Sequence, residues 1–422
     1  MGKTTNTWDV IVIGAGAAGI LAAGRAAQQG AKVLLLEKMR QPGRKLLITG
    51  KGRCNITHDA PLSEYWKNIF PNGRFLKHAL HAFFKDDILQ ILHDRGVETT
   101  TERGSRVFPV SNDAKEVLNA LLDWMGTKNI ERVFNVRVNQ LIIDSGQVKG
   151  VRAMTDQGTK EFYAQSVIIA TGGKSYPATG STGDGYELAK QAGHTITQPQ
   201  PALVPLVTRE DYASNLQGLG LKNINAVVWV NGKKTREEFG ELMFAHYGLT
   251  GPVILTLSRN VVEEISAGNN VEISIDLKPA LDEKKLDARL LRDLNEHGKK
   301  QVENIFKLWL PSSLIPVFLE ILELDGKKLC NQLGGKERKK ILLLMKDFRF
   351  TITGHPGFKE AIITAGGVPT SEIQSKTMES KLVKNLFFAG EVIDLDANTG
   401  GFNLQIAWST GWLAGQESVP KS

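Results

Sequence analysis

A glycine-rich segment near the start of the chain, Gly14-Ala-Gly16-Ala-Ala-Gly19, most constrains what the sequence can fold into. It lies between a short β-branched run, Asp9–Ile13, and an alanine-rich stretch without proline, Ala17–Gln29. Lys32–Glu37 is then typical of a second buried strand. A strand, a glycine turn, a helix and a strand within about thirty residues form one βαβ unit, which implies a parallel sheet. The pattern predicts an α/β fold.

Each glycine of this segment has a mechanical role in a dinucleotide site. Gly14 permits the tight turn, Gly16 lets the backbone approach a pyrophosphate, and Gly19 lets the helix pack on the strand. The helix N-terminus offers its N–H groups and the positive end of its dipole to the phosphates. Glu37 closes the second strand about 20 residues further on, where a carboxylate can bind ribose hydroxyls. The sequence therefore predicts a Rossmann-like dinucleotide-binding site.

The chain returns to this pattern only after a long insert. Pro199, Pro201 and Pro205 indicate a linker or a crossing between domains. We expect residues 1–194 and 355–422 to form one discontinuous domain, with 195–354 as an inserted cap domain. Its β part would span about 195–280 and its helical part about 281–346. Apolar periodicity further predicts a strand over Val133–Ile143 and a helix over Leu286–Trp309.

The charge balance is mildly basic, with 52 Lys+Arg against 45 Asp+Glu and a net charge of +7. This favours a polyanionic partner only weakly, because charge affects association and not the fold. Two clusters stand out. One lies in the expected helical part of the insert and the other follows the second strand: Lys336, Arg338, Lys339 and Lys340; Lys38, Arg40, Arg44, Lys45, Lys51 and Arg53.

Several classes of protein are disfavoured by what the sequence contains. The two cysteines, Cys54 and Cys330, form no CxxC pair, so neither a dithiol redox centre nor a metal cluster is expected. No stretch of eighteen apolar residues could span a membrane. The short apolar run at Val10–Ile13 lacks a cleavage pattern, so we expect no signal peptide and a cytoplasmic protein without a membrane partner.

Two later segments favour FAD over other dinucleotides. One is a strand ending in Ala170-Thr171-Gly172-Gly173, and the other is Phe388-Ala389-Gly390-Glu391. Because FAD is long, its ribityl chain and ring need residues that are distant in sequence from the adenosine pocket. Together with GAGAAG and Glu37, these segments resemble the two-dinucleotide-binding flavoproteins of the glutathione reductase and fumarate reductase type.

The resemblance becomes more specific along the whole chain. Five colinear segments are similar to the BaiN-type flavoproteins, which include the aminoacetone oxidase family. They are GRKLLITGKGRCNITH (43–58), MFAHYGLTGP (243–252), ITAGGVPTSEI (363–373), TMESK (377–381) and AGEVIDLDANTGGFNLQIAWSTG (389–411). The resemblance implies a Rossmann-like FAD-binding domain with an inserted β-plus-helical cap domain.

The resemblance also implies roles for individual residues toward a tightly but non-covalently bound FAD. Val138 would contact adenine through its backbone, and Glu391 would bind the ribityl chain. Arg44, Lys45 and the loop 50–55 would lie by the pyrophosphate and the flavin. The helix after Gly400-Gly401 would aim its N-terminus at the flavin and stabilise negative charge there. The full cofactor-binding set is Gly14, Gly16, Ala18, Gly19, Glu37, Lys38, Arg44, Lys45, Gly52, Arg53, Cys54, Val138, Ala170, Thr171, Gly172, Gly390, Glu391, Gly401, Phe402, Asn403 and Leu404.

Two positions depart from the family's pattern. Phe402 stands where the family commonly has Tyr, so any role of that hydroxyl is lost. Lys51 stands where a glycine is frequent, which places an extra cation near the expected pocket.

The candidate catalytic residues each have a structural alternative. Cys54 could protonate a substrate carbanion after hydride transfer, and the adjacent Arg53 would lower its pKa. Alternatively it is a small buried residue that packs beside the flavin. His246 and Tyr247 could supply a general acid, or they form only a turn before Gly248. The Lys336–Lys340 cluster either captures a polyanion or is a solvated helix face.

These observations predict an FAD-dependent oxidoreductase that accepts electrons from NAD(P)H and reduces a C=C bond. Gly180-Ser-Thr-Gly183-Asp-Gly185 is not a second nucleotide fingerprint, so NAD(P)H is expected to bind transiently. The resemblance implies as one substrate uridine in ribosomal RNA or its precursor, which would be reduced to dihydrouridine. The basic charge balance favours it weakly over a small molecule, because RNA gains affinity from each neutralised phosphate. The alternatives are a small-molecule oxidase or reductase that acts on an aminoacetone-like amine or an enone, and a flavin-holding RNA-binding or assembly protein. The sequence leaves the oligomeric state open.

Overall fold

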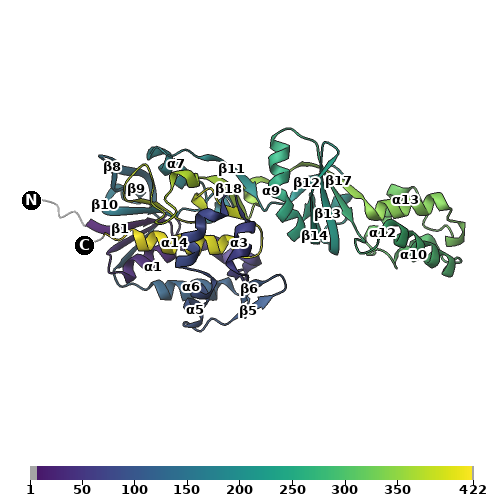
Figure 1. Cartoon of the computed structure of the whole chain (residues 1–422), viewed down its shortest axis with the longest axis horizontal. Helices are drawn as coiled ribbons and strands as arrows, with labels where there is room; N and C mark the ends of the chain where they lie inside the picture. The colour runs from purple at the N-terminus through teal and green to yellow at the C-terminus, as the bar shows by residue number, and fades with distance from the viewer. Residues whose placement is uncertain (1–6, 421–422) are drawn as a thin grey trace, which may run out of the picture. The chain divides into compact units, whose positions relative to one another are not determined.

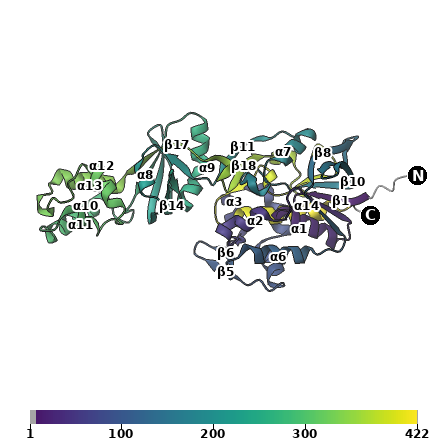
Figure 2. The ribbon, with the colours of Figure 1, turned by 180° about the vertical axis from the view of Figure 1, so that it is seen from behind.

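The computed structural model describes residues 7–420, which fall into two compact units (Figures 1 and 2). The first unit combines the described residues up to Pro201 with those from Phe358 onward, and the second runs from Ala202 to Gly357. The boundaries expected from the sequence lie at 194/195 and 354/355. The proline-rich segment includes a strand, β11 (Thr197–Ala202), which pairs with β18 (Ile363–Gly367), so the chain crosses between units at the end of a strand.

A seven-stranded sheet forms the centre of the first unit. Its order is β7-β2-β1-β10-β9-β8, and β19 also pairs with β10. The β7, β2, β1, β10 and β19 strands run parallel, whereas β9 is antiparallel to both β10 and β8. The strands are β1 (Thr7–Ile13), β2 (Val33–Glu37), β7 (Ile130–Phe134), β8 (Arg137–Asp144), β9 (Gln147–Thr155), β10 (Gly158–Ile169) and β19 (Leu386–Phe388).

The single strand expected over Val133–Ile143 is wrong, because two strands occupy this stretch. Asn135 adopts a left-handed conformation with φ +57° and separates β7 from β8. The β7 strand pairs with β2, and β8 pairs with β9. Apolar periodicity runs through both strands and so does not reveal the break.

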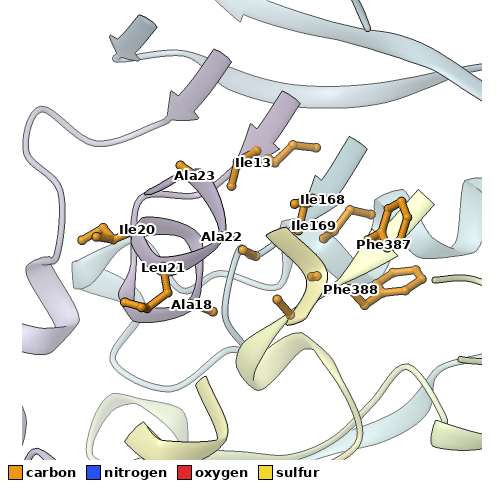
Figure 3. Packing of buried hydrophobic residues seen from close by; sticks show 14 of the residues in the cluster. Ile13, Ala18, Ile20, Leu21, Ala22, Ala23, Ile168, Ile169, Phe387 and Phe388 are labelled. Atoms are coloured by element: carbon orange, nitrogen blue, oxygen red, sulfur yellow. The ribbon is translucent and has the colours of Figure 1, made fainter. Parts of the chain in front are cut away.

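The alanine-rich helix α1 (Ala17–Gln28) and the helix α14 (Phe402–Glu417) lie side by side in the first unit (Figure 1). A Cβ on Gly411 would lie 2.3 Å from the Ala18 carbonyl oxygen, and one on Gly415 would lie 2.4 Å from that of Ala22. The α1 helix also packs on the sheet, near Ile13, Ile168 and Ile169 (Figure 3). The alanine-rich composition of α1 thus allows a close approach on both sides.

Shorter elements surround this core. The remaining helices of the first unit are α2 (Arg44–Ile48), α3 (Leu62–Asn68), α4 (Lys77–Ala82), α5 (Lys85–His93), α6 (Ala114–Met125) and α7 (Asp184–Gln191). Two small sheets join β3 (Thr57–His58), β6 (Arg106–Pro109) and β5 (Thr99–Glu102), and β20 (Asp396–Ala397) with β4 (Ile69–Phe70).

The second unit consists of a closed six-stranded barrel and a group of helices with one continuous apolar core. In order around the barrel, the strands are β12 (Leu206–Thr208), β15 (Gly248–Thr250), β14 (Lys233–Ala245), β13 (Gly220–Val230), β16 (Val271–Asp276) and β17 (Phe348–Gly354). The helices are α8 (Tyr212–Asn215), α9 (Pro252–Ser266), α10 (Glu283–Glu296), α11 (Val302–Phe306), α12 (Leu314–Leu322) and α13 (Gly335–Lys346).

The continuous helix expected over Leu286–Trp309 is also wrong. The α10 helix ends at Glu296, and Gly298 follows. Gln301 then forms an isolated antiparallel bridge with Leu329 before α11 begins at Val302. A backbone pairing between residues distant in sequence therefore interrupts the helix.

Candidate functional site

The turn after β1 has the geometry that its glycines predict. Gly14 has φ +101°, and a Cβ there would lie 2.6 Å from the Ala170 carbonyl oxygen. A Cβ on Gly19 would lie 1.8 Å from the Gly14 carbonyl oxygen, so the helix and the turn touch backbone to backbone. Around Gly16, by contrast, an ideal Cβ would have no heavy atom within 4 Å. Open space therefore lies at the one glycine where a ligand needs room.

The N-terminus of α1 has no side-chain cap. Its N-cap is Gly16, and no side chain accepts a hydrogen bond from the first turn. The first helical N–H groups lack intrahelical partners, so they need an external acceptor. An anion such as a pyrophosphate suits this position through both its oxygens and its charge.

Glu37 lies at the end of β2 beside the same turn. Its Oε2 accepts a hydrogen bond from Ala15 N at 2.7 Å, and its Oε1 accepts one from Met39 N at 2.8 Å. The two backbone bonds fix the carboxylate and keep its charge beside the helix N-terminus. Val138, expected at the adenine, is a buried residue of β8 that pairs with Ala153.

A polar network connects α2 to the segments after β10 and β19. Lys45 Nζ donates to Glu391 Oε2 at 2.5 Å and to Ser175 Oγ at 2.5 Å. Glu391 Oε1 accepts from Ser175 Oγ and from Thr364 N, each at 2.8 Å. A Cβ on Gly173 would lie 2.8 Å from Glu391 Oε1, so only a glycine fits in this place. The network brings together two residues expected at the cofactor and two, Ser175 and Thr364, without an expected role.

The neighbouring backbone of the ATGG segment is equally close-packed. Ala170 N donates to Ile13 O at 2.9 Å, which joins the end of β10 to the glycine turn. Thr171 is half-buried, with its hydroxyl 2.1 Å from where a Gly185 Cβ would lie. Gly172 has φ +73°. These residues turn the chain sharply beside the open space at Gly16.

The α1 and α14 helices run in the same direction, because Gly411 and Gly415 meet Ala18 and Ala22 in that order. The α14 helix begins at Phe402, nine residues before Gly411, so its N-terminus lies about 13 Å from Gly411 along the α14 axis. Because Gly411 meets Ala18 near the start of α1, α14 extends beyond the N-terminus of α1. Gly390 completes the contact, with its N–H donating to Thr410 Oγ1 at 2.9 Å and its Cβ position 2.9 Å from Ala18 Cβ. The N-termini of α1 and α14 thus point the same way but are offset along the helix axes. This arrangement suits an elongated anionic ligand.

The start of α14 is built from glycines. Gly401 is the N-cap, with φ +107° and no side-chain cap of the helix. With the Asn55 amide oriented so that its oxygen faces Gly401 N, that hydrogen bond is 3.1 Å long. Asn403 clamps the preceding loop, accepting from Ala397 N at 2.9 Å and donating to Ala397 O at 2.8 Å. Leu404 is half-buried on the first turn.

The Phe402 side chain is buried among aromatic rings and is not exposed to solvent. Its ring stacks on His58 at a centroid distance of 4.1 Å and meets Tyr65 edge-on at 4.9 Å. His58 Nδ1 lies 3.0 Å from Gly400 O, and burial lowers the pKa of this imidazole. Neutral His58 therefore donates from Nδ1 to the glycine turn and holds it against β3.

The loop between α2 and β3 contains an unusual run of left-handed residues. Gly50, Lys51, Gly52 and Cys54 have φ values of +58°, +60°, +85° and +60°. Such conformations cost free energy in residues other than glycine and are often found at functional sites. The loop therefore has a shape that local propensity alone does not provide.

Cys54 does not have the environment expected from its neighbour. Its side chain is fully buried, and desolvation raises the pKa of the thiol to about 12. The expectation that Arg53 lowers this pKa is wrong, because that guanidinium pairs with Glu102 at 2.7 Å and stacks over Phe108 at 4.0 Å. Cys54 is a neutral thiol at physiological pH.

The other expected cations differ in how far they are engaged. Lys38 Nζ donates to Asp184 at 2.8 Å and to Thr182 at 2.5 Å. Arg44 is the first residue of α2 and is exposed, and Lys51 is exposed in the loop between α2 and β3. Of these three, only Lys38 is held within the protein by an ion pair in the described part of the chain.

His246 and Tyr247 lie in the second unit, at the two-residue turn between β14 and β15. The His246 side chain is exposed, and its ring meets the Tyr247 ring edge-on at 4.4 Å. Tyr247 O accepts from Thr208 N at 3.1 Å, which ties the turn to β12. The two residues form a hairpin turn, and a role for either as an acid stays a prediction.

The basic cluster on α13 is partly neutralised. Arg338 forms two hydrogen bonds with the Asp287 carboxylate at 2.9 and 3.2 Å, and Lys339 pairs with Glu283 at 2.8 Å. Both carboxylates belong to α10. Half of the cluster is therefore engaged within the second unit.

The sequence reasoning missed a buried polar chain beneath the start of α14. Thr57 Oγ1 donates to Gln405 Oε1 at 2.7 Å, and Gln405 Nε2 donates to Ser409 Oγ at 3.0 Å. Ser409 Oγ donates to Phe83 O at 2.7 Å. Thr57 and Gln405 both lie in segments that carry the family resemblance, and polar residues in apolar surroundings were the signal that could have singled them out.

The family of the chain follows from a match over nearly its full length. The family model described as HI0933-like protein Rossmann domain matches residues 8–417. The chain belongs to this family. The expected resemblance is thereby confirmed, as is the prediction of an FAD-dependent oxidoreductase.

Two relatives are similar over almost the whole chain. The ribosomal RNA dihydrouridine synthase of Escherichia coli (strain K12) is 31% identical over 416 residues, covering 98% of this chain and 98% of the relative. The 3-dehydro-bile acid delta(4,6)-reductase of Clostridium scindens is 30% identical over 414 residues, covering 97% and 98%. Sequence identity alone does not choose between these two relatives.

A solved quinol-fumarate reductase with menaquinol molecules has a similar fold. It aligns with a TM-score of 0.54 and 19% identity, covering 99% of this chain and 71% of that one. The predicted α/β Rossmann-like fold class is confirmed. Within residues 7–420, no helix is long and apolar enough to cross a membrane.

Proposed function

We propose that the chain binds FAD along the parallel α1 and α14 helices and reduces a C=C bond conjugated to a carbonyl group. The observation that carries this proposal is the pair of glycine-started helix N-termini, which point the same way about 13 Å apart along α14. The open space at Gly16 fits a pyrophosphate, and the fixed Glu37 carboxylate can accept hydrogen bonds from ribose hydroxyls.

The residues present also fit the remainder of a flavin dinucleotide. Lys45 and Glu391, already paired with each other, would bind the ribityl and phosphate region. Gly390, Gly401 and the loop 50–54 would line the ring. Reduced FAD, when bound, supplies a hydride to the substrate. The protein's own contribution is to hold the α14 N-terminus near the ring, where its positive dipole end stabilises developing negative charge.

Reduction of the double bond needs a proton as well as a hydride. For uridine, a bound reduced flavin would supply the hydride to one carbon of the C5=C6 bond, and a protein group would supply the proton to the other. Cys54 is a poor proton source, because the high pKa of its buried thiol makes it a weak acid at neutral pH. We propose His246 or Tyr247 of the second unit as the proton donor.

We propose uridine in ribosomal RNA as the substrate and NAD(P)H as the transient electron donor. The relative named ribosomal RNA dihydrouridine synthase matches over the full length, and the net charge of +7 suits a polyanion. Segment Gly180–Gly185 follows a 3-10 turn and not a strand, so it does not offer a second nucleotide fingerprint. We further propose that the inserted segment 195–354 contributes to substrate binding.

A steroid-like enone is the second candidate, because the bile acid reductase is nearly as similar. Flavin reoxidation separates the two. The purified protein is reduced with NAD(P)H under anaerobic conditions and then mixed with unmodified ribosomal RNA or with a conjugated steroid dienone. Rapid reoxidation by RNA alone, with dihydrouridine found by mass spectrometry, is the expected result. Reoxidation only by the dienone would move the substrate to the second candidate, and no reduction by NAD(P)H would refute the proposed donor.

A further inference from the structure

A short segment of the first unit carries basic side chains on one face only. The 3-10 turn Gly73–Leu76 leads directly into α4 (Lys77–Ala82), and together they form the segment 73–82. Arg74, Lys77, His78 and His81 are all exposed. Their spacing of three, four and seven residues places them along one side of a helical segment. These four residues are called the α4 basic face below.

The opposite face of the same segment is fixed in the core. Phe75, Leu76, Ala79 and Leu80 are buried in the main apolar cluster of the first unit. The α4 basic face is therefore held at the surface by burial of the other side, at no further cost in ordering the backbone.

The α4 basic face is structurally connected to the candidate cofactor site. The α4 helix packs against α14, and Phe83 just after it accepts a hydrogen bond from Ser409 of α14 at 2.7 Å. The buried chain through Gln405 and Thr57 continues to the first turn of α14. All of these residues belong to one compact unit, so the face and the site keep a defined relation.

Three of the four carboxylates in the flanking segments have partners outside the α4 basic face. Glu64 pairs with Lys67 at 2.8 Å, Asp59 pairs with Lys85, and Asp87 accepts from Phe84 N at 2.7 Å. Asp86 follows on the first turn of α5. Within residues 7–420, no member of the α4 basic face forms an ion pair. The His81 imidazole forms a hydrogen bond with the backbone carbonyl of Lys77.

We infer that the α4 basic face binds the phosphate backbone of the RNA substrate, an inference that rests on the proposed function. Cations without a carboxylate partner gain most from a phosphate, because no ion pair has to be broken first. From Arg74 to Lys77 and on to His81, the face is about 10 Å long, enough for more than one phosphate. Such contacts position an RNA without reading its sequence.

The test is the salt dependence of RNA binding by the FAD-loaded protein. The probe is a fluorescein-labelled single-stranded RNA that contains uridine, titrated at about 50–200 mM salt. Each phosphate neutralised on a single strand adds about 0.7 to the slope of log affinity against log salt, so R74Q/K77Q should lower the slope by about 1.4. Over that fourfold range of salt, the wild-type protein should lose about sevenfold more affinity than the variant.

A matched variant controls for net charge. K128Q/K384Q removes two exposed lysines elsewhere on the same unit and should leave the slope within error of wild type. FAD content and the rate of flavin reduction by NAD(P)H should be equal in all three proteins. An unchanged slope in R74Q/K77Q, with normal RNA binding by the wild type, overturns the inference and leaves the proposed function standing. If the wild type itself does not bind the RNA, both are overturned.

Discussion

Two pairs of helices in the molecule, α10 with α13 and α1 with α14, differ in how far the protein itself pairs their charges. In the second unit, Asp282 caps α10 by accepting from Lys285 N at 2.8 Å, and Glu337 accepts from Gly334 N at the start of α13. Two cations of α13, Arg338 and Lys339, pair with α10. In the first unit, α1 and α14 begin at glycines without a side-chain cap. The α13 helix also begins after an N-cap glycine without a side-chain cap, so what separates the two pairs is the ion pairing between α10 and α13. The uncapped N-termini of α1 and α14 suit an anionic ligand.

The same contrast separates the two basic surfaces. The cluster on α13 is the denser of the two in sequence, but Arg338 and Lys339 already have carboxylate partners. Arg74 and Lys77 of the α4 basic face have none within the described residues. A count of charges along a sequence is therefore a poor guide to a polyanion surface, because pairing between distant residues decides which charges remain available.

The largest effect is expected where the first unit is most tightly packed. In G19V, the new side chain would collide with the Gly14 carbonyl, since even a Cβ there lies 1.8 Å away. We expect a loss of about 3 kcal/mol or more in the free energy of unfolding, together with loss of bound FAD. Thermal unfolding and flavin absorbance measure both.

A glycine at the start of α13 provides the control in the second unit. A Cβ on Gly335 would meet no atom within 4 Å, so G335A should leave stability unchanged or raise it by up to about 1 kcal/mol. Equal stability of G19V and wild type would refute the packing explanation of the motif.

The next effect separates ligand space from packing space. G16A should fold normally, because its Cβ has no neighbour within 4 Å and its φ of −85° is ordinary. If the pyrophosphate occupies that space, the methyl group should cost about one charge-assisted hydrogen bond, roughly 1.5–3 kcal/mol. The Kd for FAD should then rise at least about tenfold. If G16A binds FAD with wild-type affinity and is as stable as the wild type, the phosphates of FAD do not occupy this position.

A smaller effect is expected at Cys54. A general acid contributes about 10²–10⁴-fold to the rate, whereas a packing residue contributes little. We expect C54A to keep turnover within about threefold of wild type. Because desolvation raises the pKa of the thiol to about 12, no thiol ionisation should appear in the wild-type pH–rate profile between about pH 6 and 10. A hundredfold loss in C54A would restore this residue as the proton donor.

The smallest effect is expected on α13. The sequence leaves open whether the Lys336–Lys340 cluster captures a polyanion or is a solvated helix face, and in the first case the loss of Lys339 and Lys340 would change the salt slope by roughly two. Since Lys339 already pairs with Glu283, we now expect K339Q/K340Q to change the slope of RNA binding less than R74Q/K77Q does. A larger change on α13 would reverse the comparison between the two basic surfaces.

The sequence predicted the elements whose cause is local. The first βαβ unit, the roles of Gly14 and Gly19 and the position of Glu37 all follow from residues close together in the chain. The break at Asn135 depends on a single left-handed residue, and the break after Glu296 depends on the pairing of Gln301 with Leu329. The periodicity of apolar residues does not reveal either break.

The site was predictable in outline but not in its electrostatics. Lys45 and Glu391 are 346 residues apart, and Arg338 and Asp287 are 51 residues apart. Their pairing depends on tertiary structure. The same is true of the hydrogen bond from Arg53 to Glu102, which holds the guanidinium away from the Cys54 thiol. The α4 basic face escaped notice because four residues at helical spacing are a weak signal until the other side of the segment is known to be buried.

Cellular ribosomal RNA itself shows whether the protein reduces uridine there. Ribosomal RNA from cells that lack the gene, and from the same cells carrying the wild-type or G16A gene, is digested and examined by mass spectrometry for a gain of two mass units on uridine. We predict that the dihydrouridine is lost on deletion, restored by the wild-type gene and lowered in amount with G16A. Ribosomal RNA with identical dihydrouridine content in all strains would contradict it.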